Sequence, residues 1–227
     1  MRDSSLARTL PRLVLIICAP LVLLLSNLYV AATPAFIRWE YAKSGFPPAW
    51  RYGTAERLSL AEATLHYLRS AEPAEYLTGL SSGGDAVYNL REVEHLVDVK
   101  VVMSGAFWVH GACAVLCGLA IALSWRVPGE RAGVLLALSQ GCLGFLALMV
   151  AVGLLAYANF NVFFTIFHGV FFEGDTWLFS FSDTLIQLFP VRFWMDATWL
   201  IAVLTALECG TVGIVTYARS RRQRGTS

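Results

Sequence analysis

The run LVLIICAPLVLLLSNLYVAA, residues 13–32, is almost unbroken apolar sequence. As an α-helix rising ~1.5 Å per residue, it is long enough to cross the ~30 Å hydrocarbon core of a bilayer. A basic segment with Arg2, Arg8 and Arg12 precedes it, so a secretory signal peptide is the competing interpretation. Pro34 follows closely on the Ala-Ala-Thr at which a signal peptidase would cut, and it disfavours cleavage. We therefore favour an uncleaved first membrane span.

The composition of the whole chain also indicates a membrane protein. Of the 227 residues, 57% are hydrophobic and 15% are charged, whereas about 25% are charged in soluble domains. The mean hydropathy is +0.60. The formal net charge of +1 gives no indication of nucleic-acid binding, and we expect none. We therefore interpret the chain as an integral membrane protein whose loops carry most of the polar groups.

Three more apolar runs follow the first, at residues 101–124, 133–157 and 196–217. Each is long enough for a transmembrane helix. We therefore expect an all-α integral membrane protein with four transmembrane helices, forming a single membrane domain over residues 1–227. The runs leave two long connecting segments, 33–99 and 159–195.

The first connecting segment, 33–99, predicts a helical lobe between spans 1 and 2. Its beginning, from Pro34 to Gly53, is rich in Pro, Gly and aromatic residues and predicts a loop. In SLAEATLHYLRS, residues 59–70, apolar residues recur at helical spacing, with acids early and Arg69 late. We expect an amphipathic helix from about Thr54.

The distribution of Lys and Arg predicts the orientation. Arginines gather at the N-terminus, in the loop 125–132 and after Tyr217. The segment 33–99 is acidic on balance, and the segment 159–195 has Arg192 as its one base. The positive-inside rule then places both termini in the cytoplasm. Both long segments would lie on the outer side of the cytoplasmic membrane.

The second connecting segment surrounds one histidine with aromatic residues. It reads NFNVFFTIFHGVFFEGDTWLFSFSDTLIQLFPVRFW at residues 159–194 and contains His168. A lone histidine on an apolar face is usually a buried structural residue. His95 lies in the other long segment, on the same predicted side, so the two imidazoles can meet. Such a pair can act as general base and general acid near neutral pH, with Asp98 or Asp175 fixing a tautomer.

A metal site is the main competing interpretation, since two histidines and two aspartates can bind zinc or manganese. The sequence has no His-Glu-x-x-His motif, and its five cysteines all lie within apolar runs. It also lacks the Gly-x-Ser-x-Gly motif of a serine nucleophile. We therefore expect no metal. A metal-dependent membrane lipid hydrolase and a non-enzymatic envelope protein remain open as alternative functions.

Two polar residues lie within predicted spans: His110 near the middle of the second and Glu208 near the middle of the fourth. Polar groups inside a bilayer are costly unless they are paired. Counting along the helices places the two at similar depth. We expect them to face each other, together with Gln140. Proton movement is the functional alternative.

Two stretches resemble the motifs of one known family. They are EHLVDVK (Glu94 to Lys100), which leads into a span, and FHGVFFEGDTWLFSFSDTLIQLFP (Phe167 to Pro190). They are similar to a four-span bacterial membrane family, long of unknown function, that includes the lipoprotein intramolecular transacylase. The four spans and the loop order fit as well, so the resemblance covers most of the chain.

The resemblance implies an acyltransferase. Its reaction moves a fatty acyl chain from the glycerol of a diacylated lipoprotein to the amine of the N-terminal cysteine, which gives a lyso-form lipoprotein. The matching residues are His95 and His168, which become the expected catalytic pair. The expected partners are the lipoprotein and membrane lipid, and no metal, nucleotide, other cofactor or covalent acyl-enzyme is implied.

Further roles are expected from position. Asp98 and Asp175 would orient the imidazoles, and Lys100 or a backbone amide would stabilise an oxyanion. The acyl chains would be bound by apolar aromatic residues of the second segment, namely Phe164, Phe167, Phe171, Phe172 and Trp177.

Overall fold

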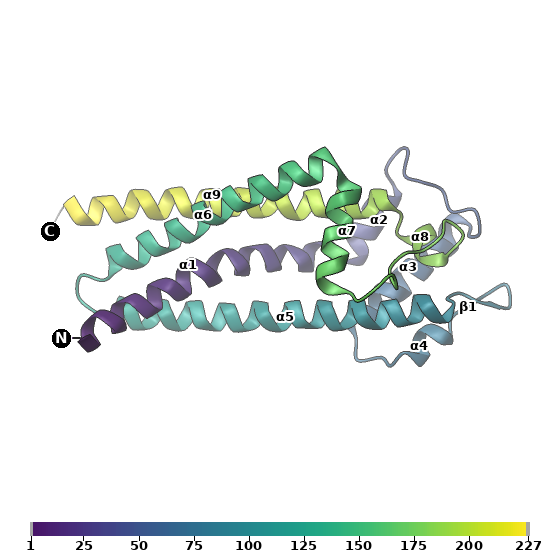
Figure 1. The fold of residues 1–227 in the computed structure, drawn as a ribbon, viewed down its shortest axis with the longest axis horizontal. Helices are drawn as coiled ribbons and strands as arrows, with labels where there is room; N and C mark the ends of the chain where they lie inside the picture. The colour runs from purple at the N-terminus through teal and green to yellow at the C-terminus, as the bar shows by residue number, and fades with distance from the viewer. Residues whose placement is uncertain (1, 226–227) are drawn as a thin grey trace. The chain divides into compact units, whose positions relative to one another are not determined.

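The computed structural model describes residues 2–225 of the chain. Four long helices dominate it: α1 (Arg2–Ala31), α5 (Leu90–Trp125), α6 (Arg131–Ala158) and α9 (Val191–Gly225) (Figure 1). Each contains a stretch long and apolar enough to span a membrane. The predicted all-α membrane fold with four spans is confirmed.

The helices extend beyond the apolar runs that predict them. α5 begins at Leu90, although its apolar run covers only 101–124. Likewise α9 begins at Val191, ahead of the run at 196–217. Backbone hydrogen bonding continues through polar sequence as long as the residues tolerate helix. His95 is therefore held on a continuous helix instead of a loop.

Short elements connect the long helices. They are α2 (Pro34–Tyr41), α3 (Thr54–Arg69), α4 (Glu75–Thr78), α7 (Phe160–Phe171), α8 (Thr184–Leu188) and a two-residue hairpin of β1 (Ser81–Ser82) and β2 (Asp85–Ala86). The hairpin pairs Ser81 with Ala86. α3 confirms the amphipathic helix predicted from Thr54.

The loop predicted at the start of the first connecting segment is wrong in part, because α2 occupies Pro34–Tyr41. The Thr33 hydroxyl caps this helix by accepting a hydrogen bond from the backbone N–H of Phe36 at 3.2 Å. Pro34 stands at the first helical position, where its missing N–H costs nothing and its fixed φ is suitable. The proline therefore starts a helix here instead of excluding one.

The chain divides into two compact units, which we describe separately. Unit 1 consists of Met1–Leu28, Phe107–Tyr157 and Ile201–Ser227, and unit 2 of Tyr29–Ala106 and Ala158–Leu200. The expectation of a single membrane domain over the whole chain stays a prediction.

Unit 1 is held together by apolar side chains and by one close backbone approach. Leu15, Ala120, Val134 and Ala137 form a buried cluster. At Gly141 of α6, an added Cβ would lie 2.5 Å from the carbonyl oxygen of Ile16, so glycine allows α1 and α6 to touch. Trp108 and other large apolar side chains of α5 are exposed, as expected for a surface in contact with lipid.

Two adjacent residues of α1 bind the polar residues of the predicted spans. The Ser26 hydroxyl oxygen lies 3.0 Å from Nε2 of His110, and the Asn27 amide donates to the Glu208 carboxylate at 2.9 Å. Glu208 is partly buried. Gln140, which we expected beside this pair, is exposed. α1 thus supplies two hydrogen-bonding groups that we did not predict.

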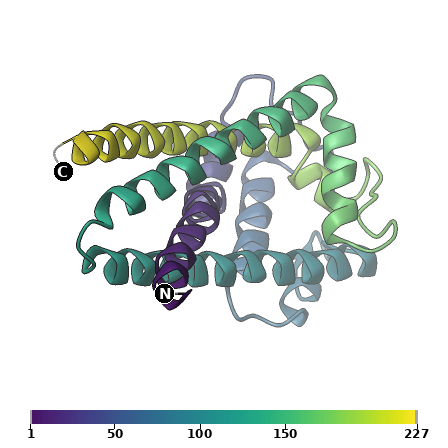
Figure 2. The ribbon, with the colours of Figure 1, turned by 60° about the vertical axis from the view of Figure 1, so that its left-hand side comes forward.

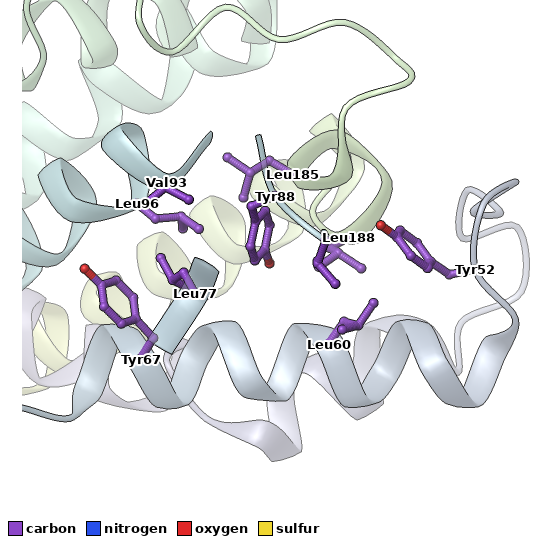
Figure 3. Packing of buried hydrophobic residues seen from close by; sticks show 10 residues of the cluster. Tyr52, Leu60, Tyr67, Leu77, Tyr88, Val93, Leu96, Leu185 and Leu188 are labelled. Atoms are coloured by element: carbon purple, nitrogen blue, oxygen red, sulfur yellow. The ribbon is translucent and has the colours of Figure 1, made fainter. Parts of the chain in front are cut away.

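Unit 2 contains the folded lobe. Its larger core takes residues from α3, α4, α5 and α8, including Leu60, Tyr67, Leu77, Val93, Leu96 and Leu188 (Figure 3). A buried carboxylate completes this packing: Glu92 accepts the backbone N–H of Leu185 at 2.8 Å and that of Asn89 at 2.9 Å. Glu92 therefore ties the first turn of α5 to the start of α8.

Candidate active site

The helix α7 carries His168 into the interior of unit 2. Its start is capped by the Asn159 side chain, which accepts the backbone N–H of Val162 at 3.2 Å. Most residues of α7 are apolar, and the polar residue His168 is nevertheless buried, with only 7% of its surface exposed. His95 of α5 is equally buried, at 8% exposed.

The structure brings these two histidines together. Their ring centroids lie 6.2 Å apart, with 20° between the ring planes. This is where the C-terminal end of α7 meets the first part of α5 (Figures 1 and 2). The two residues are 73 positions apart in the sequence (168 − 95), so the fold of unit 2 creates the pair.

Aromatic rings enclose both imidazoles. Phe172 lies against both, with centroid distances of 5.0 Å to His95 and 5.3 Å to His168. The other contacts to His168 come from Phe164 (4.0 Å), Trp177 (4.6 Å) and Phe167 (5.6 Å), and Phe179 packs on His95 at 5.3 Å. We call Phe164, Phe172, Trp177 and Phe179 the aromatic cage, and the more exposed Phe167 lies at its outer surface. Phe179 was not predicted, since nothing in its local sequence distinguishes it from its neighbours.

Hydrogen bonding defines the tautomer of His168. Its Nδ1 lies 2.8 Å from the carbonyl oxygen of Phe164. A carbonyl oxygen can only accept, so Nδ1 carries the proton and donates. The neutral ring then keeps its lone pair on Nε2, which is left to act as a base. For His95, Nδ1 is buried and has no hydrogen-bond partner within residues 2–225.

The cage lowers the proton affinity of both rings. Both histidines lie outside the apolar runs that span the membrane, since His95 precedes the run 101–124. Burial, assisted by the nearby His168, lowers the pKa of His95 to about 4. Burial also lowers the pKa of His168, although its hydrogen bond to the Phe164 carbonyl opposes this. Both rings are therefore neutral near pH 7.

The predicted orienting aspartates are not where we expected them. Asp98 and Asp175 are both exposed, and the acceptor at Nδ1 of His168 is a backbone carbonyl. Asp98 follows His95 by three residues on α5. Residues at this spacing lie only approximately on the same face of a helix. The helical backbone of α7 replaces a carboxylate in fixing the ring of His168.

Lys100 is also displaced from its predicted role. Its ammonium donates to the carbonyl oxygen of Glu72 at 2.5 Å and lies 4.0 Å from the centroid of the Tyr67 ring. Five residues on an α-helix correspond to a rotation of about 140° past a full turn. Lys100 therefore points away from His95, toward the segment that follows α3.

Arg91, which was not predicted, packs on the cage. Its guanidinium lies 5.0 Å from the centroid of Phe179, the ring that contacts His95. Arg91 is also paired with Asp183 at 3.4 Å. It precedes His95 by four residues, and this helical spacing is the signal that could have identified it.

The predicted acyl-binding residues are divided between the cage and its outer surface. Phe164, Phe172 and Trp177 pack on the imidazoles and are partly buried. Phe171 and Phe167 lie 4.8 Å apart and are exposed. Within residues 2–225, no group of three or more His, Cys, Asp or Glu side chains is placed to hold a metal ion.

Comparison with known proteins identifies the family. The model of the lipoprotein intramolecular transacylase (Lit) family matches residues 13–194. This chain belongs to that family. It is therefore a multi-pass membrane acyltransferase that acts on lipoproteins.

A curated relative and two solved structures are similar to this chain over most of its length. An uncharacterized protein of Aquifex aeolicus (strain VF5) is 31% identical over 204 residues, which is 88% of this chain and 90% of the relative. The membrane-integral transacylase Lit of Bacillus cereus has a similar fold, with a TM-score of 0.62 and 20% identity, and covers 96% of both chains. A structure of that protein with a histidine-to-alanine mutation has a TM-score of 0.61 at 18% identity.

Proposed function

We propose that His95 and His168 form the catalytic pair of this transacylase. The substrate is a diacylated lipoprotein whose N-terminal cysteine carries an S-diacylglyceryl group and a free α-amine. The observation that carries the proposal is the 6.2 Å approach of two buried imidazoles inside an aromatic cage. A histidine pair with a purely structural role would not need the free ring nitrogen that each of them keeps.

The reaction is a transfer within one molecule. The amine nitrogen attacks the ester carbonyl carbon, the new bond is an amide, and the bond that breaks joins the carbonyl carbon to a glycerol oxygen. One proton leaves the nitrogen and one arrives on the glycerol oxygen, so no net proton is consumed. Because amine and ester belong to one substrate, holding them close supplies much of the acceleration.

His168 is suited to carry that proton. Its Nδ1–H is committed to the Phe164 carbonyl, which leaves Nε2 to accept a proton from the nitrogen once it has attacked. The same ring then returns the proton to the glycerol oxygen. The hydrogen bond to Phe164 also stabilises the transient imidazolium, because a charged donor bonds more strongly than a neutral one.

His95 is suited to bind the carbonyl oxygen. Burial and the neighbouring His168 lower the pKa of His95 to about 4, so the ring is neutral and has one N–H to donate. A donor aimed at the oxygen that gains negative charge stabilises the tetrahedral intermediate. This assignment replaces Lys100, whose ammonium is bound to Glu72.

The site lies on the outer side of the cytoplasmic membrane, with both chain termini in the cytoplasm. This orientation is supported by the arginine-rich N-terminal, 125–132 and C-terminal segments. The exposed rings of Phe167 and Phe171 are apolar surface next to the cage and are suited to bind the acyl chains.

Mass spectrometry of a lipoprotein's N-terminal peptide tests the proposal. We would express the protein in a bacterium that lacks lipoprotein N-acylation, alongside His95→Ala, His168→Ala and, as control, His66→Ala. His66 is an exposed histidine of α3 in the same unit. We expect the acyl chain on the amine with the wild type and the control, and on glycerol with the other two. An N-acylated peptide in a well-expressed His168→Ala strain would refute the pair.

A further inference from the structure

The last turns of α9 form a second candidate site, far along the sequence from the two histidines. Residues 209–227 contain no Asp or Glu but include four arginines, at 219, 221, 222 and 224. Two of them, Arg221 and Arg224, line a groove with Tyr217 and Ser220 of α9 and Leu136 of α6. All five residues belong to unit 1. The groove has a volume of about 410 Å³.

The groove has one polar wall and one apolar wall. Tyr217, Ser220, Arg221 and Arg224 are spaced at i, i+3, i+4 and i+7, which places them on one face of α9. Leu136 lies five residues inside α6, about 7.5 Å along the helix from Arg131. A ligand in the groove would therefore meet cations and hydroxyl groups on one side and hydrocarbon on the other.

The two guanidinium groups are available for a ligand. Within residues 2–225, neither Arg221 nor Arg224 is ion-paired or hydrogen-bonded. By contrast, Arg12 and Arg8, near the other end of the chain, bind Glu130 at 2.6 and 3.3 Å. The Ser220 hydroxyl donates to the Tyr217 carbonyl at 2.8 Å, so it contributes only acceptor lone pairs. Among the residues that line the groove, the two arginines and Tyr217 thus have side-chain donors that are not used elsewhere within residues 2–225.

We infer that this groove binds the phosphate of an anionic phospholipid, with the glycerol end of one acyl chain against Leu136. Arginine binds phosphate oxygens through two parallel N–H bonds. In a zwitterionic headgroup, the ammonium partly offsets the negative charge of the phosphate, so the attraction to arginine is weaker. A basic cluster at the end of a membrane span is attracted to anionic lipid, and each base contributes about tenfold or less to the affinity. The apolar wall favours a lipid over a free phosphate ion. This site is independent of the proposed catalytic pair.

Native mass spectrometry of the detergent-solubilised protein can count bound lipid. The protein would be titrated separately with phosphatidylglycerol, with phosphatidylcholine of the same chains, and with phosphatidylglycerol plus equimolar inorganic phosphate. The variant is Arg221→Gln with Arg224→Gln. The matched control is Arg219→Gln with Arg126→Gln, which removes the same charge. Arg219 lies about 200° around α9 from Arg221, off the groove.

We expect one tightly bound phosphatidylglycerol, with an apparent affinity that falls roughly 30-fold in the groove variant and by less than threefold in the control. Equal losses in both variants would overturn the inference, because summed charge alone would explain the binding. Equal binding of phosphatidylcholine would overturn it as well. Displacement of the lipid by equimolar phosphate would reassign the groove to a free phosphate ion.

Discussion

The Nδ1 atom of His168 lies 2.8 Å from the carbonyl oxygen of Phe164, one helical turn earlier in α7. A backbone acceptor does not change charge with pH and does not leave when a side chain is replaced. It fixes one tautomer of the ring as long as α7 is intact. The backbone of α7 therefore keeps the lone pair of the neutral His168 ring on Nε2.

The transacylation rate should follow the ionisation of the substrate amine. The pKa of both histidines is lowered by burial, that of His95 to about 4, so neither ring gains a proton as the pH falls from 8 to 7. The amine must lose its proton to attack, and it titrates near ~7.7–8.0. Initial rates of N-acylation between pH 6 and 9 should fall about tenfold per pH unit below ~7.5. A plateau down to pH 7 with a bend near 6.5 would instead indicate titration of an ordinary histidine.

Removing Trp177 should weaken catalysis more than binding. Its ring lies 4.6 Å from that of His168, and Trp177→Ala would admit water to the cage. We expect kcat to fall about tenfold, the equivalent of one aromatic contact, with KM changed less. Trp50→Ala is the matched control, because its side chain is 74% exposed in the same unit. Equal kinetics for the two variants would show that the cage does not influence the reaction.

Glu92→Ala should destabilise unit 2. The variant leaves the buried backbone N–H of Leu185 and the part-buried backbone N–H of Asn89 without their acceptor, which costs about 3 kcal/mol. The thermal midpoint in detergent should drop clearly. Glu94→Ala, two residues along α5 at an exposed position, should change stability by less than about 0.5 kcal/mol. Similar midpoints for both variants would mean that Glu92 does not tie α5 to α8.

Asn27 and Glu208 should be energetically coupled. Their hydrogen bond of 2.9 Å joins α1 to α9 within unit 1. A double-mutant cycle of Asn27→Leu and Glu208→Leu, followed by unfolding in detergent, should give a coupling of about 1 kcal/mol. Additive single effects would indicate that Glu208 is held by other groups.

The sequence predicted the fold well because membrane spans depend on local composition. Each apolar run can be recognised from its own residues, without knowledge of the rest of the chain. The start of α2 was missed because Pro34 suggested a loop, whereas proline also suits a first helical position. Helix ends beyond the apolar runs were missed because hydropathy reports burial in lipid and not backbone conformation.

The prediction of the site was less complete, and the reason is geometric. The histidines were recognisable from their aromatic context and from the family motifs. Which side chain then faces an imidazole depends on helix rotation and on contacts across the fold. Lys100 and Asp98 are close to His95 in sequence yet point elsewhere. Phe179 reaches the site only because the segment after α7 returns to α5, where Arg91 then packs on its ring.

The central claim is that the two imidazoles act as one site, and a kinetic double-mutant cycle tests it most directly. We would measure the rate of N-acylation of a diacylated lipopeptide by the purified wild type, His95→Ala, His168→Ala and the double variant. Residues that act as a unit lose activity non-additively. We predict that the double variant is no slower than the slower single variant. A double variant whose loss equals the product of the two single losses would contradict the account.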